Sequence, residues 1–284
     1  MPETSVIMFQ VVNGLLWGCI IALIALGLSL IFGIMQIINM AHGDLYMVGA
    51  VGAAIVSLQF GSLWPALVVV PLLLGLAAMP VERWVLRPFE SRPLATMVGT
   101  LGLSFIIQQT VLITWGGTPT TVLPPVNFIV TVAGAPIPGY RLVAAGIGLA
   151  LVGLLWAIIY KTHFGLLLRA TIERPDIADA LGVNTSTIRA LSFGLGVALA
   201  GIGGVLAAPI ENVFYLMGFD VLLFAFIVVI VGGLGSLSGT LVAALALSGL
   251  EGLFASFFEP VQARVLVFLL MAAVIVLKPR GILR

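Results

Sequence analysis

Residues 6–33 read VIMFQVVNGLLWGCIIALIALGLSLIFG, a stretch without a single Asp, Glu, Lys or Arg. About 20 consecutive apolar residues are enough for a helix to cross the hydrocarbon core of a bilayer. The stretch therefore predicts a membrane-spanning helix. No positive charge precedes it and no clean small-residue cleavage site follows it, so we expect a retained span rather than a cleaved secretory signal.

The composition of the whole chain agrees with a membrane environment. Apolar residues make up 61% and charged residues 8% of the 284 residues, against about 45–50% and 25% in soluble domains. The net charge of +1 gives no basic field for nucleic acid. The single cysteine excludes an intramolecular disulfide and a cysteine metal cluster, and two histidines argue against a histidine-based metal site.

Eight further apolar runs predict further spans. They cover residues 43–60, 63–82, 94–115, 140–160, 190–208, 219–235, 238–255 and 261–278. Three of the runs are short or interrupted by glycine, so eight spans with one re-entrant piece fit nearly as well as nine. We therefore predict an all-α fold: one polytopic transmembrane helical bundle over residues 1–284, with about eight or nine spans and broken or re-entrant helices.

The basic residues predict the orientation of the chain. Ten of the 12 Lys and Arg residues fall in 83–92, 161–189 and 278–284, which lie on one side if nine spans alternate. Because basic loops stay in the cytoplasm, we expect the N-terminus outside and the C-terminus in the cytoplasm.

Two segments are too polar or too rich in proline to span. The external segment 116–139 contains five prolines, and we expect a short β-hairpin or an extended loop there. The cytoplasmic segment 161–189 holds a predicted short helix, with Pro175 as its first residue and Gly182 at its end. About two helical turns are not stable alone in water, so this helix needs a partner surface.

Polar residues interrupt the apolar pattern at 37–44, which reads INMAHGD after Ile37. Polar groups inside a membrane domain are unfavourable unless they are paired. Asn39 and Asp44 suit the start of a helix, which favours capping and packing. The alternative is that Asn39, His42 and Asp44 lie on a transport path or gate.

A glycine-rich segment separates two later apolar runs. It reads GGLGSLSG over 232–239, and its Gly232, Gly233 and Gly235 allow helices to break or to pack closely. Close packing is the simpler interpretation, and a place on the path is the second. Glu251 lies within an apolar run, where a hydrogen-bonded acid is the simpler interpretation and an ion relay the alternative.

The sequence contains no recognisable site for ATP hydrolysis. Lys161 follows Tyr160 instead of the glycine that a phosphate-binding loop requires, and Lys278 is followed by Pro279. No nucleophile elbow is present either. We therefore expect no enzyme activity and no cofactor or metal bound by this chain.

Four segments resemble one known family. They are Leu28–Ala50, Arg169–Asn184, Ala225–Gly239 and Lys278–Leu283. In this order they are similar to the first-span signature, the cytoplasmic coupling segment, the late glycine-rich segment and the C-terminal ending of permeases in the branched-chain amino acid ABC importer family. The resemblance covers almost the whole chain.

This resemblance implies a bacterial inner-membrane subunit surrounded by lipid. Its implied partners are a second homologous permease, two ATPase subunits that bind ATP and Mg, and an extracytoplasmic solute-binding protein. The implied solute is a branched-chain amino acid or a related amino acid, amide, urea or small organic acid. The external loop 116–139 would meet the binding protein.

The resemblance also assigns residues to ATPase coupling. They are Arg169, Glu173, Arg174, Pro175, Asp176, Asp179 and Gly182. Asp179 departs from the family pattern, which has a small residue at that position, so the register of docking is open.

Two other function classes remain to be weighed. An ion-coupled secondary transporter or channel would use embedded acids such as Asp44 and Glu251. A membrane scaffold would have no transport activity at all.

Overall fold

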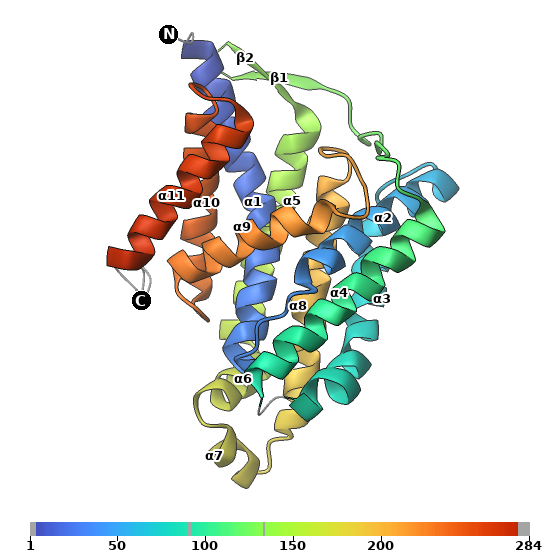
Figure 1. Cartoon of the computed structure of the whole chain (residues 1–284), viewed down its shortest axis with the longest axis vertical. Helices are drawn as coiled ribbons and strands as arrows, with labels where there is room; N and C mark the ends of the chain where they lie inside the picture. The colour runs from blue at the N-terminus through green and yellow to red at the C-terminus, as the bar shows by residue number, and fades with distance from the viewer. Residues whose placement is uncertain (1–3, 90–91, 133, 278–284) are drawn as a thin grey trace.

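The computed structural model describes residues 4–89, 92–132 and 134–277, and over these the predicted all-α class is confirmed (Figure 1). The helices are α1 (Thr4–Met35), α2 (His42–Phe60), α3 (Ala66–Val81), α4 (Pro93–Trp115), α5 (Gly139–Lys161), α6 (His163–Glu173), α7 (Pro175–Ala180), α8 (Thr185–Ala207), α9 (Met217–Gly232), α10 (Leu237–Phe254) and α11 (Pro260–Leu277). A π-helical turn (Glu82–Leu86) and a 3₁₀ turn (Arg87–Phe89) follow α3, and the two strands are β1 (Ile129–Val132) and β2 (Ala135–Pro138).

Each of the nine predicted apolar runs forms a helix. In the described part of the chain, seven helices are long and apolar enough to cross a membrane, namely α1, α2, α3 with its following turns, α4, α5, α8 and α10. The other two, α9 and α11, are shorter apolar helices. Helix α9 lies across the neighbouring helices rather than along them (Figure 1). The predicted C-terminal ending at 278–284 lies outside the described residues.

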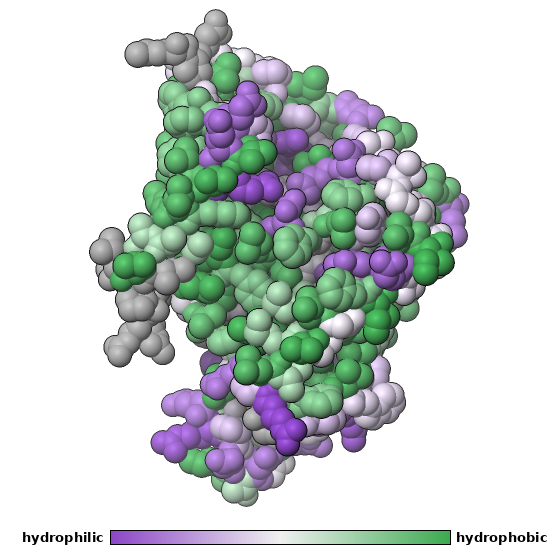
Figure 2. Space-filling view, viewed as in Figure 1, coloured by the Kyte–Doolittle hydropathy of each residue, from purple (hydrophilic) through white to green (hydrophobic). Residues whose placement is uncertain are grey.

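The core surrounds α1. Most residues of α1 from Gly18 to Ile31 are buried, and α1 packs against α5, α8, α9 and α10. By contrast α4 exposes large apolar side chains such as Leu94 and Ile113, which are 80% and 81% exposed. The face seen in Figure 2 is accordingly largely apolar between its two ends, with smaller hydrophilic patches toward the end that carries the hairpin. Such a surface is stable only against lipid.

Helices α1–α4 and α8–α11 form two similar halves, and corresponding helices in the two halves run in opposite directions. α1 begins at the end of the molecule that carries the β-hairpin, whereas α8 begins near α7 at the other end (Figure 1). α1 packs against α10, and its counterpart α8 packs against α3. α2 contacts α9, and both of these helices follow a non-helical stretch. α1–α4 and α8–α11 thus have the arrangement of an inverted repeat, which is common in membrane transporters.

Paired glycines occur where the two halves cross. A Cβ on Gly75 of α3 would lie 2.9 Å from the carbonyl oxygen of Gly194 in α8, and a Cβ on Gly194 would lie 2.7 Å from that of Gly75. At the matching crossing of α1 and α10, a Cβ on Gly14 would lie 3.1 Å from the Cα of Gly252, and a Cβ on Gly252 would lie 3.2 Å from the Cα of Gly14. These crossings need glycine because backbone meets backbone.

The two ends of the bundle carry different structures. The hairpin pairs Ile129 with Pro138 at one end, where the sequence predicts a hairpin or extended loop. Before it, Thr120 exchanges two backbone hydrogen bonds with Val213, at 2.9 and 2.8 Å. α7 lies at the opposite end (Figure 1). Helix α6, which the sequence analysis did not separate from the polar segment 161–189, lies between α5 and α7.

Candidate translocation site

Helix α2 begins inside the bundle rather than at its edge. The Nε2 atom of His42, its first residue, lies 3.0 Å from the carbonyl oxygen of Ile24 in α1. Ile24 precedes the end of α1 at Met35 by 11 residues, or about 16 Å at 1.5 Å per residue. The segment 36–41 therefore runs back along α1 before α2 starts. In the other half, 208–216 separates α8 from α9 in the same way.

The N-termini of α2 and α9 meet. A Cβ on Gly43 would overlap the carbonyl oxygen of Gly218 and lie 2.7 Å from the Cβ of Leu222. A Cβ on Gly218 would in turn overlap the carbonyl of Gly43. Helix N-termini carry partial positive charge and unpaired N–H groups. Discontinuous helices of this kind form solute sites in many transporters.

The polar residues of 37–44 are buried around this junction. The side-chain oxygen of Asn39 accepts a hydrogen bond from the N–H of Ala41 at 3.1 Å, just before α2. Asp44, in the first turn, accepts one from Gln108 of α4 at 2.9 Å. Asn39, His42 and Asp44 are at most 2% exposed. These contacts favour the packing interpretation, and a direct role on the path remains a prediction.

The glycine-rich segment forms the turn between α9 and α10. Gly233 and Gly235 have φ of 97° and 81°, which only glycine adopts readily. Gly232 packs its carbonyl against Gly239. Gly235 also lines a cavity of about 270 Å³ together with Arg169 and Glu173. The structure thus brings one predicted path residue next to two predicted coupling residues.

The coupling segment contains the predicted short helix. α7 runs from Pro175 to Ala180, and Gly182 follows with φ of 83°. Arg174 precedes the helix and Asp176 lies in its first turn. Asp179, the departure from the family pattern, accepts a hydrogen bond from Thr185 of α8 at 2.7 Å.

α6 fixes this segment to the membrane domain. The guanidinium of Arg169 donates a hydrogen bond to the carbonyl of Ile159 in α5, and it stacks 5.3 Å from the ring of Tyr160. On α7, by contrast, Ile177 is 51% exposed, and the following Leu181 is 79% exposed. Helix α6 is therefore fixed against α5, and α7, which follows it, exposes apolar side chains to the outside.

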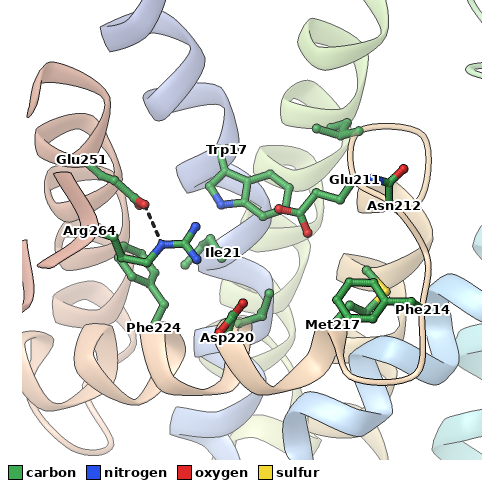
Figure 3. A pocket seen from close by; sticks show the side chains of 12 residues that line it. Trp17, Ile21, Glu211, Asn212, Phe214, Met217, Asp220, Phe224, Glu251 and Arg264 are labelled. Carbon is green, nitrogen blue, oxygen red and sulfur yellow. Dashed lines mark hydrogen bonds and ion pairs between the residues drawn. The ribbon is translucent and has the colours of Figure 1, made fainter. Parts of the chain in front are cut away.

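A charged cavity opens between α1 and the helices α9, α10 and α11. Its volume is about 380 Å³, and Figure 3 shows its lining. Four charged residues border it: Glu211 before α9, Asp220 on α9, Glu251 on α10 and Arg264 on α11. Asn212 and seven apolar residues complete the lining: Trp17, Ile21, Ile210, Phe214, Met217, Val221 and Phe224. We call it the acidic cavity, because three carboxylates face one guanidinium.

Two of these carboxylates have side-chain partners. Arg264 donates its Nε hydrogen to Glu251 at 3.0 Å. The hydroxyl of Tyr46 donates to Glu211 at 3.3 Å. Burial raises the pKa of the Glu211 carboxyl in the loop before α9, and the Tyr46 hydrogen bond and the Arg264 charge oppose this. A second cavity of about 230 Å³ adjoins it and includes Arg141, which donates a hydrogen bond to Asn13.

The sequence analysis missed two residues of the acidic cavity. Glu251 was considered from the sequence, whereas no role was assigned to Glu211 or Arg264. The available signal was a charged residue beside or within an apolar run, which in a membrane protein indicates a functional position. The convergence of these residues from three helices and a loop was not visible in the sequence.

Comparison with known proteins identifies the family. The family described as "Branched-chain amino acid transport system / permease component" matches residues 10–276. The permease protein BraD of a high-affinity branched-chain amino acid transport system in Pseudomonas aeruginosa is 29% identical over 302 residues, covering 100% of this chain and 97% of BraD. LivH of Escherichia coli, named in the same way, is 29% identical and covers 96% of this chain and 94% of LivH.

A third relative matches only in part. The nucleoside ABC transporter permease protein NupC of Lactococcus lactis is 36% identical over 72 residues, which are 25% of this chain and 21% of NupC. No solved structure matches the chain. The full-length matches and the seven long apolar helices show that the chain belongs to the branched-chain amino acid ABC transporter permease family and is a multi-pass protein of the inner membrane.

Proposed function

We propose that this chain is the membrane subunit of a binding-protein-dependent importer that two partner ATPases drive. It moves a small polar solute: a branched-chain amino acid or a related amino acid, amide, urea or small organic acid. ATP and Mg bind in the partners, and this chain supplies the path. A second homologous permease completes the membrane part. The exposed apolar face of the anchored helix α7 is the observation that carries the proposal.

The shape of α7 suits a docking element. A helix of six residues does not hold its shape by its own hydrogen bonds. Here α6 and the Thr185 bond to Asp179 support it from the membrane side. Ile177 and Leu181 remain exposed beside Arg174 and Asp176. Exposed apolar side chains with charged neighbours are typical of a protein interface.

The orientation follows from the positive-inside rule. Lys161, Arg169, Arg174 and Arg189 lie in 161–189, at the end that carries α7, so we place this end in the cytoplasm with the ATPases. The hairpin and the external loop then face the solute-binding protein. A path between the ends would pass the junction of α2 and α9, where the two inverted halves meet.

The experiment is a charge reversal in α7. Arg174→Glu or Asp176→Lys is expected to leave the folded permease in the membrane but to lower ATPase copurification and to separate ATP hydrolysis from uptake. Arg83→Glu, another exposed basic position, is the matched control. Unchanged coupling in both α7 variants would contradict the proposal.

A further inference from the structure

We propose that the extracytoplasmic solute-binding protein regulates the junction of α2 and α9 through the loop 208–216. It docks in a groove at the outer end of the molecule, and a backbone bridge between Thr120 and Val213 carries the movement of the docking segment to this loop. The inference rests on the proposed import function. It adds the route by which the partner outside the membrane acts on the path.

The groove lies between the turn that joins α2 to α3 and the extended segment 120–125. Its volume is about 400 Å³. The end of α2 and residues 61–64 form one side, and residues 120–125 form the other. Leu58 and Leu123, one on each side, are 73% and 82% exposed. The groove is therefore an open surface with large apolar side chains on both of its sides.

This groove faces water rather than lipid. Residues 121–125 form neither helix nor strand, and irregular backbone does not occur against the hydrocarbon of a bilayer. The segment lies at the end of the molecule opposite α7 (Figure 1), which the orientation in the proposed function places outside. Exposed apolar side chains in water are typical of a contact with another protein. On this side of the membrane, the partner in the proposed function is the solute-binding protein.

Thr120 connects the groove to the loop before α9. Its N–H donates to the carbonyl of Val213 at 2.9 Å, and the N–H of Val213 donates to the carbonyl of Thr120 at 2.8 Å. Thr120 also lines the groove, whereas Val213 is fully buried. The same two segments approach each other at Gly117, where a Cβ would lie 4.0 Å from the ring of Tyr215. Two hydrogen bonds between one pair of residues resist both sliding and separation, so a displaced Thr120 moves Val213 with it.

The loop 208–216 is attached to both helices of the junction. It leads directly into α9 at Met217, and the carbonyl of the next residue, Gly218, packs against Gly43 of α2. Within the loop, the Glu211 carboxylate accepts a hydrogen bond from the Tyr46 hydroxyl of α2 at 3.3 Å. Figure 3 shows Glu211 in this loop and Met217 at the start of α9. A shift of the loop therefore moves α9 through the chain itself and acts on α2 through Tyr46.

The acidic cavity leaves the loop room to move. Glu211 and Phe214 line this cavity of about 380 Å³, so one side of the loop borders open space. The other side is bonded to Thr120. At the junction itself, by contrast, backbone packs directly against backbone at Gly43 and Gly218. Because closely packed elements switch between discrete arrangements instead of deforming continuously, a small shift of the loop is enough to open or close this contact.

The first experiment measures ATP hydrolysis by the permease–ATPase complex in lipid nanodiscs, with and without the purified binding protein loaded with L-leucine. Tyr46→Phe removes only the hydroxyl that bonds to the loop, and Val213→Pro removes the N–H that bonds to Thr120. Each variant should lower the stimulation by the binding protein, relative to its own basal rate, at least about fivefold, which is the lower end of typical coupling between two sites. Tyr140→Phe is the matched control, because its buried hydroxyl bonds to Leu206 in α8 instead of to the loop. It should keep the wild-type stimulation.

The second experiment locates the docked binding protein. Leu123→Cys carrying a photo-crosslinker should become linked to the binding protein, whereas the equally labelled Phe105→Cys, exposed in the middle of α4, should not. The native cysteine, Cys19, is buried, so the label goes to the new position. Absence of the crosslink from Leu123, or a crosslink to the second permease in its place, would overturn the docking site.

Wild-type stimulation in Tyr46→Phe or in Val213→Pro would overturn the inference. If Val213→Pro fails to assemble, Tyr46→Phe decides alone, since it keeps the ring and loses only the hydroxyl. ATP-dependent leucine uptake without any stimulation by the binding protein would also overturn the inference and would leave the proposed function intact. No ATP-dependent uptake of any solute would overturn the proposed function itself.

Discussion

The contact between the N-termini of α2 and α9 gives a quantitative prediction for Gly43→Ala. A Cβ at this position would lie 2.7 Å from the Cβ of Leu222 and 2.9 Å from the carbonyl carbon of Gly218. Carbon atoms pack best at about 3.5–4.0 Å, so the two helices would have to separate by roughly 1 Å. The neighbour is backbone and cannot rotate away.

The expected loss of stability is the difference of two effects. Overpacking costs about 1–3 kcal/mol, and the upper half applies because backbone atoms are involved. Replacing glycine by alanine inside a helix stabilises the folded protein by about 0.5–1 kcal/mol. Gly43→Ala should therefore destabilise the protein by about 1–2.5 kcal/mol. Gly218→Ala, on the other side of the contact, should have a similar effect.

The assay is equilibrium unfolding of purified protein in bicelles. Gly146→Ala is the matched control, because a Cβ there would meet nothing within 4 Å. It should be neutral or stabilising by up to about 1 kcal/mol. In the double variant Gly43→Ala with Gly218→Ala, one separation of the helices relieves both overlaps. The combined loss should therefore fall short of the sum of the single losses.

The reasoning would be refuted if Gly43→Ala were as stable as Gly146→Ala. Strict additivity in the double variant would also contradict it, since that would mean the two glycines do not share one contact.

Three further predictions concern other contacts. Glu82→Ala should destabilise the protein by about 1–3 kcal/mol in the same assay, because the buried Glu82 is bonded twice to Arg87, at 2.6 and 3.1 Å. Tyr140→Phe should cost about 1 kcal/mol, since the buried hydroxyl donates to the carbonyl of Leu206 at 2.9 Å. Ile177→Ser should leave stability nearly unchanged, because this side chain is 51% exposed, but should reduce ATPase copurification. An unstable Ile177→Ser variant would argue against an external partner for this face.

The sequence was sufficient to predict the helices, but not how far inside the bundle a helix such as α2 begins. Every apolar run became a helix because its length and composition leave few alternatives in lipid. The local signals Pro175 and Gly182 also predicted the bounds of α7 well. The reversal at 36–41 was not predictable, since it depends on Thr100 of α4. This threonine accepts the N–H of Met40 at 3.1 Å and donates to the carbonyl of Ile38 at 3.3 Å.

The candidate site was predictable only where chemistry is local. Asp44 stands in the first turn of α2, as its position suggested, but its partner Gln108 is distant in sequence. Glu211 and Arg264 come together through tertiary packing of α1, α9, α10 and α11. No spacing rule connects residues 53 positions apart, so the acidic cavity required the structure.

The most direct test of the account is leucine uptake into proteoliposomes under two energy sources. Vesicles that contain the chain with its second permease, the ATPases and the binding protein should accumulate labelled L-leucine with ATP and Mg on the ATPase side. A non-hydrolysable ATP analogue should support no accumulation. Vesicles with this chain alone should not accumulate leucine under a proton or sodium gradient. Gradient-driven accumulation by the chain alone would contradict the account and support an ion-coupled transporter.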